Sequence, residues 1–220
     1  MDAALPADVT ALRHDFFVRA RARLNLHVPA ALNDPAAEAK RGDLDLDPSL
    51  WERAGVTATR PASVLIPVID RPDPMVLLTV RTELPSHPGQ IAFPGGKIDA
   101  GDVSPAAAAL REAQEEIGLT RELVESIGYL DLYLTFSGYR ILPTVARVQP
   151  DYRLTLCEAE VADAFEVPLA FLMDVQNHAL HSRDWRGITR KYYAMPFGER
   201  YIWGVTAGIL RNLYQRIYQQ

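Results

Sequence analysis

Apolar residues occur along the chain in short runs and in helical stripes, and this pattern predicts the order of its elements. Two apolar runs, residues 62–69 and 75–81, lie on either side of the polar segment DRPDP, which predicts a strand, a turn and a second strand. Two further strand patterns, at about 125–135 and at 139–148, are separated by the turn FSGY. Short strands mixed with long helices predict a layered α+β fold.

Three segments have the pattern of helices. Residues 7–25 carry apolar side chains at helical spacing, and a stripe of apolar residues runs through the closing segment 203–218. Between them, residues 104–119 begin with Ser104 and Pro105, which are typical of a helix N-cap and of the first helical position. The segment EVADAFEVPLAFLMD is interpreted as leading into a short helix, and residues 179–185 and 190–197 are interpreted as a late hairpin.

The first fifty residues differ from the rest. Residues 27–50 contain three prolines and four aspartates within a weak apolar pattern, which predicts an irregular connector. We therefore expect an N-terminal helix and connector in residues 1–50 and a catalytic domain in residues 51–220.

Composition narrows the class of protein. Hydrophobic residues make up 48% and charged residues 23%, as in globular proteins. No apolar run approaches the ~18 residues that a membrane span needs, and a net charge of −5 argues against nucleic-acid binding. Cys157 is the only cysteine, so no intrachain disulfide can form, which fits a cytoplasmic protein. The sequence leaves the oligomeric state open, with a homodimer as one alternative.

The helix pattern at 104–119 carries an unusual acidic stripe. Glu112, Glu115 and Glu116 share one helical face, where like charges cost about 0.2–0.5 kcal/mol per pair. The turn at Gly95 and Gly96 precedes this helix and could present a backbone carbonyl beside the carboxylates. Oxygen ligands of this kind suit Mg²⁺ or Mn²⁺. The alternative is a solvated acidic face, on which Arg111 pairs with Glu115.

Residues 96–119 resemble the signature of the Nudix hydrolases, G-x5-E-x7-R-E-U-x-E-E-x-G-U, in which U is apolar. The matching residues are Gly96, Arg111, Glu112, Ala113, Glu115, Glu116, Gly118 and Leu119. Two positions depart from the signature. Asp102 stands in place of the first glutamate, and eight residues instead of seven separate it from Arg111.

Residues 77–96 resemble the motif that precedes this signature in the coenzyme A diphosphatase branch of the family. The matching residues are Leu77, Leu78, Thr79, Arg81, Gly89, Phe93, Pro94, Gly95 and Gly96. Thr82 replaces a serine, the segment after Arg81 is one residue shorter, and Pro85 or Ser86 stands where the branch often has a second arginine.

The resemblance implies an α/β/α sandwich with a mixed sheet. It implies Mg²⁺- or Mn²⁺-dependent hydrolysis of the diphosphate bond of coenzyme A or a derivative, which gives 4′-phosphopantetheine and adenosine 3′,5′-bisphosphate. One alternative is another nucleoside diphosphate derivative, such as ADP-ribose or a dinucleotide. Another is a nucleotide-binding regulator without activity, although such modules usually lose the glutamates of the signature. In each case the partner is a small molecule.

The resemblance also implies roles for individual residues. Its catalytic residues are Glu112, Glu115 and Arg111, and its metal ligands are Glu112, Glu116, Glu115 and the carbonyl of Gly95. Its substrate-binding residues are Arg81, Gly89 and Phe93, and Glu160 is a candidate further acid, ahead of Glu166. Further candidates are Arg60 and Arg140 for an additional phosphate. Aromatic residues that either stack on adenine or belong to the core are Trp185, Tyr192, Tyr193 and Trp203.

Overall fold

The computed structural model describes residues 9–37, 41–43, 45–47, 58–82, 89–185 and 188–219. Its helices are α1 (Val9–Arg23), α3 (Pro105–Ile117), α4 (Leu169–Met173) and α5 (Val205–Tyr218), with 3₁₀ turns η1 (Ala30–Leu32), η2 (Arg121–Leu123) and η3 (Val175–Asn177). Its strands are β1 (Arg41–Gly42), β2 (Arg60–Ile69), β3 (Met75–Arg81), β4 (Ile91–Ala92), β5 (Gly95–Lys97), β6 (Val124–Tyr129), β7 (Tyr133–Leu134), β8 (Tyr139–Val148), β9 (Val161–Pro168), β10 (Ala179–Trp185), β11 (Ile188–Phe197) and β12 (Arg200–Trp203).

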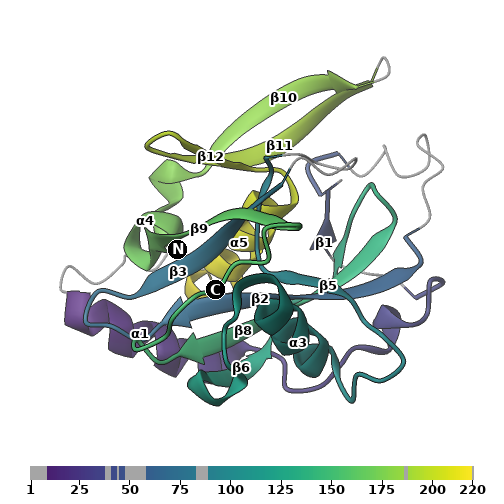
Figure 1. Cartoon of the computed structure of the whole chain (residues 1–220). Coiled ribbons are helices and arrows are strands. Elements are labelled where there is room, and N and C mark those ends of the chain that lie inside the picture. Colours follow the sequence, from purple (N-terminus) through teal and green to yellow (C-terminus); the bar gives the residue numbers. More distant parts are fainter. Residues whose placement is uncertain are drawn as a thin grey trace.

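The strands form two sheets. Within the described residues, the larger sheet has nine strands in the order β1-β7-β8-β2-β3-β4, with β5 paired to β2, β6 to β8 and β9 to β3. Strands β2 and β8 run parallel, whereas β3 is antiparallel to both β2 and β9, so the sheet is mixed. Strands β10, β11 and β12 form a separate antiparallel sheet above the larger one in Figure 1.

Helices cover both faces of the larger sheet. Because side chains alternate along a strand, β2 presents apolar residues to both layers. Leu65 and Ile69 of β2 face α3, and Ile66 and Val68 face the layer that contains α1, α4 and α5. All four side chains are fully buried. This arrangement confirms the predicted α/β/α sandwich with a mixed sheet (Figure 1).

Strand β2 changes its partner along one edge, and this change positions the turn before α3. Its first half pairs with β5 and its second half with β3. Between the two halves, Leu65 N–H donates to Pro94 O over 2.8 Å. Gly95 has φ 149°, and a Cβ at this position would lie 2.5 Å from the carbonyl oxygen of Ser63. Only glycine therefore allows the turn to lie this close to β2.

Helix α3 is capped at its start and attached at its end. The Ser104 hydroxyl accepts a hydrogen bond from Ala107 N–H at 3.1 Å, as expected for an N-cap. At the other end, the backbone N–H groups of Thr155 and Cys157 donate to the carbonyls of Ile117 and Glu116, each at 2.9 Å. These two contacts fix the C-terminal end of the helix against the segment that precedes β9.

Several elements differ from the sequence predictions. The segment between β3 and the acidic helix is rich in Gly and Pro and contains the short strands β4 and β5, and the connector predicted to be irregular contains β1. The segment expected only to lead into a helix forms β9, which pairs with β3 over its whole length. The closing helix begins later than expected, at Val205, because Arg200–Trp203 form β12.

The N-terminal helix is part of the main core. Phe16 and Ala20 are fully buried in the same cluster as the apolar face of α5. Arg23 Nη1 donates to the carbonyl of Ile217 at 3.0 Å, which ties α1 to the end of α5. The division expected near residue 50 lies outside the described residues, and α1 packs into the domain that follows it.

We expect Phe16→Ala to lower the free energy of unfolding by roughly 3–5 kcal/mol, because it leaves a cavity between α1 and α5. The matched control is Val18→Ala on the same helix, since Val18 is 52% exposed. Urea unfolding measures both changes. Equal small losses in the two variants would contradict the packing of α1 into the core.

Candidate metal and diphosphate site

Glu116 is a buried acid of α3 that points at the glycine turn. Glu116 is 6% exposed, and its Oε2 accepts a hydrogen bond from Gly95 N–H at 3.1 Å. Burial raises the pKa of Glu116 to about 7, against the lowering effect of this hydrogen bond. A bound cation would stabilise the charged form of this buried carboxyl group and lower its pKa again.

Glu112 lies against Gly96 of the same turn. A Cβ at position 96 would lie 2.6 Å from the Glu112 carboxylate, so the absent side chain makes room for it. Burial raises the pKa of Glu112, and the neighbouring Arg111 opposes that shift. The turn therefore brings two partly desolvated carboxylates, those of Glu112 and Glu116, to its own backbone.

Arg111 joins the acidic residues around it. Its Nε and Nη2 donate to the two carboxylate oxygens of Asp102, each at 3.1 Å. Its Nη1 donates to Glu112 and to Glu115, each at 3.0 Å. The pKa of Asp102 is lowered mainly by this guanidinium. Asp102, which stands in place of the first glutamate of the signature, thus orients Arg111.

The remaining acids are less fixed. The Glu115 side chain is 59% exposed and is turned toward Arg111. Glu160 is exposed in the turn before β9, and its charge contributes to raising the pKa of both Glu112 and Glu116. Among the described residues, no three acidic, His or Cys side chains already surround one point. The buried carboxylate of Glu116 and the half-buried one of Glu112 nevertheless fit a divalent cation beside the turn at Gly95 and Gly96, and Glu115 and Glu160 are the candidates for a further ligand.

Arg81 faces this site from the end of β3. The β3–β9 register shifts between Val80 and Arg81, and such a bulge redirects a side chain. The backbone of Arg81 closes the following loop, since its N–H donates to Gln90 O and its carbonyl accepts from Gly89 N–H. Its positive charge lowers the pKa of Glu116, whereas burial has the larger, opposite effect. The guanidinium therefore lies near Glu116.

Comparison with known proteins identifies the family. A model of the NUDIX domain matches residues 59–188. The chain belongs to the Nudix family. Two relatives carry the name "Uncharacterized Nudix hydrolase NudL": one from Escherichia coli strain K12, 40% identical over 159 residues, and one from Cronobacter sakazakii, 41% identical over 167 residues. Each alignment covers 72% of this chain and 83% of the relative.

Solved Nudix structures resemble part of the fold. A Caenorhabditis elegans Ap4A hydrolase complex gives a TM-score of 0.43 at 20% identity and covers 49% of this chain and 80% of that one. The NUDIX domain of Shewanella oneidensis NrtR, in complex with ADP ribose, gives 0.41 at 19% identity, over 56% and 84%.

The family membership defines the class of reaction. The protein is a Nudix hydrolase of small nucleoside diphosphate derivatives, and hydrolases of this family need divalent metal ions. The described helices are all too short or too polar to cross a bilayer.

Other predicted residues of this Nudix hydrolase have structural partners. Phe93 is 5% exposed in the main core, so its side chain packs there and does not line an open site. Glu166 bonds to Arg71 and Tyr152, away from the acidic pair. Arg140 is buried and donates to the carbonyls of Ala31, Ala37 and Ala58. The expectations for Glu166 and Arg140 as site residues are therefore wrong.

Three predicted positions have other environments. Gly89 is exposed at the loop end with φ 67°, where it contributes its backbone. Arg60 lies 4.1 Å from the ring centre of Tyr139 and donates to Ser137 O. The loop positions Pro85 and Ser86 and the side chain of Trp185 lie outside the described residues.

We expect the stability of the metal-free protein to depend on pH through Glu116. Its pKa rises from 4.5 in the unfolded chain to about 7 in the fold, so its contribution is fully favourable below about pH 4.5 and is lost as pH rises through 7. In chelator at pH 8, Glu116→Gln should therefore be about 1–3 kcal/mol more stable than wild type, with no gain near pH 4.5. Urea unfolding at both pH values measures this, with exposed Glu122→Gln as control. A gain independent of pH would contradict it.

We also expect Mg²⁺ or Mn²⁺ to raise the melting temperature, because cation binding removes the repulsion between Glu112 and Glu116. At ten times its dissociation constant, a cation adds about 1.4 kcal/mol. Glu112→Gln and Glu116→Gln should lose most of the shift and most of the hydrolysis, while exposed Glu199→Gln keeps both. Full turnover in chelator would rule out this metal site.

Proposed function

We propose that this Nudix hydrolase cleaves the diphosphate bond of coenzyme A or a derivative, with Mg²⁺ or Mn²⁺ at Glu112 and Glu116. The observation that carries the proposal is the side chain of Arg81. It has no hydrogen bond or ion pair to another described residue, although its backbone ties the loop. A loop that is closed by backbone bonds leaves the guanidinium to bind phosphate. The likeness of residues 77–96 to the coenzyme A diphosphatase motif supports this substrate.

The residues of the site fit the reaction. A water molecule attacks one phosphorus of the diphosphate, and the other phosphate leaves with the bond electrons, so that each product carries one of the two phosphates as a monoester. A divalent cation, when bound, neutralises the phosphate oxygens and lowers the barrier to attack. Arg111 holds Glu112 and Glu115 in place, and Glu112 or Glu115 accepts the proton of the water. Arg81 binds the 3′-phosphate of coenzyme A, which lies outside the bond that is cleaved.

A second candidate substrate is another nucleoside diphosphate derivative, such as ADP-ribose or a dinucleotide. The observation that favours it is the missing second arginine in the loop, where Pro85 and Ser86 stand. A non-catalytic nucleotide-binding module is disfavoured, because Glu112, Glu115 and Glu116 are all retained.

We expect a preference for coenzyme A over dephospho-coenzyme A, which lacks only the 3′-phosphate. A charge-assisted contact to that phosphate is worth about 1.5–3 kcal/mol, or roughly ten- to a hundredfold in kcat/KM. Arg81→Ala should remove this preference and keep the rate on the dephospho substrate. Product chromatography with both substrates measures the rates.

The matched control for this experiment is Arg121→Ala, an exposed arginine of η2. It should keep the wild-type preference. Equal losses on both substrates in Arg81→Ala would mean that Arg81 supports the loop. Faster cleavage of ADP-ribose than of either coenzyme would favour the second candidate.

A further inference from the structure

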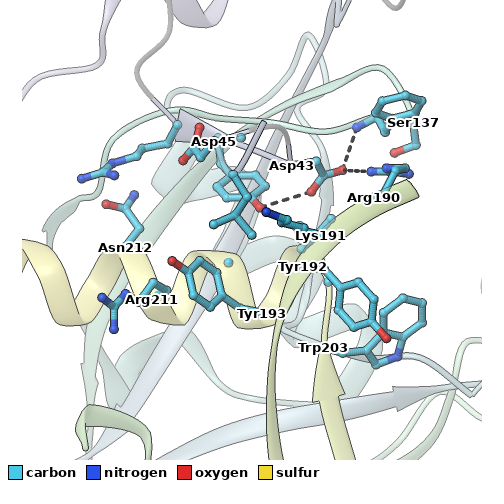
Figure 2. A pocket seen from close by; sticks show the side chains of 18 of the residues that line it. Asp43, Asp45, Ser137, Arg190, Lys191, Tyr192, Tyr193, Trp203, Arg211 and Asn212 are labelled. Atoms are coloured by element: carbon cyan, nitrogen blue, oxygen red, sulfur yellow. Dashed lines mark hydrogen bonds and ion pairs between the residues drawn. The ribbon is translucent and has the colours of Figure 1, made fainter. Parts of the chain in front are cut away.

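A cavity lies between the three-stranded sheet, α5 and the segment around β1. Its volume is about 540 Å³, and none of the described residues that line it belongs to the acidic helix α3. We call it the hairpin pocket, defined by Arg41, Tyr192, Tyr193, Trp203, Arg211 and Asn212. Figure 2 shows Asn212 and Arg211 on α5 toward one end of this pocket, and Tyr192 and Trp203 toward the other.

Asn212 is the most informative residue of the hairpin pocket. It is 2% exposed, yet neither its amide oxygen nor its amide nitrogen has a hydrogen-bond partner among the described residues. A buried amide without partners is costly, and such groups are usually satisfied by a ligand or by an ordered water. Asn212 also borders a neighbouring cavity of about 370 Å³. Its amide thus offers one donor and one acceptor to a molecule in the pocket.

The charge of the pocket favours an anion. Among the described residues that line it, five are cationic and two are acidic, whereas the whole chain has a net charge of −5. One cation and one acid of this set form an ion pair with each other, since Arg190 lies 3.8 Å from Asp43 (Figure 2). The described part of the lining has four further cations, Arg41, Arg183, Lys191 and Arg211, and one further acid, Asp45. A cluster of this kind suits phosphate groups.

The other wall of the pocket is aromatic. Tyr192 and Trp203 meet edge to face with their ring centres 5.4 Å apart. Tyr193 lies between them and α5, with the guanidinium of Arg211 5.5 Å from its ring centre. Aromatic faces beside cations bind planar rings by stacking. The sequence predicts that these residues either belong to the core or stack on adenine. The structure places all three on the wall of the pocket.

The hairpin pocket is built mainly from segments outside the NUDIX match at residues 59–188. Arg41 lies before that range, and Tyr192, Trp203 and Asn212 lie after it. One wall residue connects the two sites, because the carbonyl of Gln90 accepts the N–H of Arg81 at 3.0 Å. A ligand in the pocket therefore contacts the loop that carries Arg81.

We propose that the hairpin pocket binds a nucleotide, whose ring lies against Tyr193 and bonds to the Asn212 amide, and whose phosphate meets Arg41, Lys191 and Arg211. This proposal is independent of coenzyme A as the substrate. The nucleotide is either the nucleotide end of the substrate or a separate molecule.

Calorimetric titration of the metal-free protein with adenosine 3′,5′-bisphosphate, adenosine and inorganic phosphate tests the proposal, because chelator removes phosphate binding through a cation. The bisphosphate should bind more tightly than adenosine or phosphate alone. Asn212→Leu should weaken it at least tenfold, a change of about 1.4 kcal/mol. Asn212→Asp has the same shape and should weaken the bisphosphate more than adenosine.

The charge contribution is tested with Lys191→Gln and a matched control, Arg153→Gln, at an exposed position away from the pocket. Only Lys191→Gln should weaken the bisphosphate. Wild-type affinity in Asn212→Leu would mean that Asn212 holds an ordered water only, and no binding at millimolar concentration would exclude a nucleotide site. Either result overturns the proposal, whichever substrate the enzyme cleaves.

Steady-state kinetics with the bisphosphate distinguish the two sources. A rise in KM alone assigns the pocket to the nucleotide end of the substrate, and a change in kcat at constant KM assigns it to a separate nucleotide. Asn212→Leu should abolish the effect in both cases. An undiminished effect in that variant would contradict the proposal.

Discussion

The guanidinium of Arg111 is the interaction on which the acidic site depends. It binds both oxygens of Asp102 on one side and one oxygen each of Glu112 and Glu115 on the other. It also lies 3.5 Å from a carboxylate oxygen of Asp99, so that one cation compensates four neighbouring carboxylates, whereas Glu116 is not among its partners. Among the described residues Glu116 has one hydrogen-bond donor, the N–H of Gly95, and the charge of Arg81 opposes the effect of burial only in part, so a bound cation would balance the charge of this buried acid.

Local signals in the sequence were sufficient for the elements that carry the site. The apolar runs at 62–69 and 75–81 correspond to β2 and β3, and the capped acidic helix was predicted within two residues at each end. The i, i+3, i+4 spacing of the glutamates predicted a shared face. The same spacing predicted the Arg111–Glu115 pair, which the structure contains at 3.0 Å.

Nonlocal contacts account for what the sequence did not reveal. Strand β5 has only three residues, and its pairing with β2 is set by a close backbone approach instead of by side-chain periodicity. Arg140 appeared as a candidate anion contact, but its partners are carbonyls that lie far away in the sequence. The hairpin pocket likewise joins residues near 41 to residues near 212, which no local motif connects.

The attachment of α3 at its C-terminal end affects how the site can respond to a ligand. Its last carbonyls accept the N–H groups of Thr155 and Cys157. The helix therefore cannot slide without breaking these backbone bonds. Adjustment at the acidic face must come from the rotamers of Glu112, Glu115 and Glu116, so structures with and without ligand should share one backbone there.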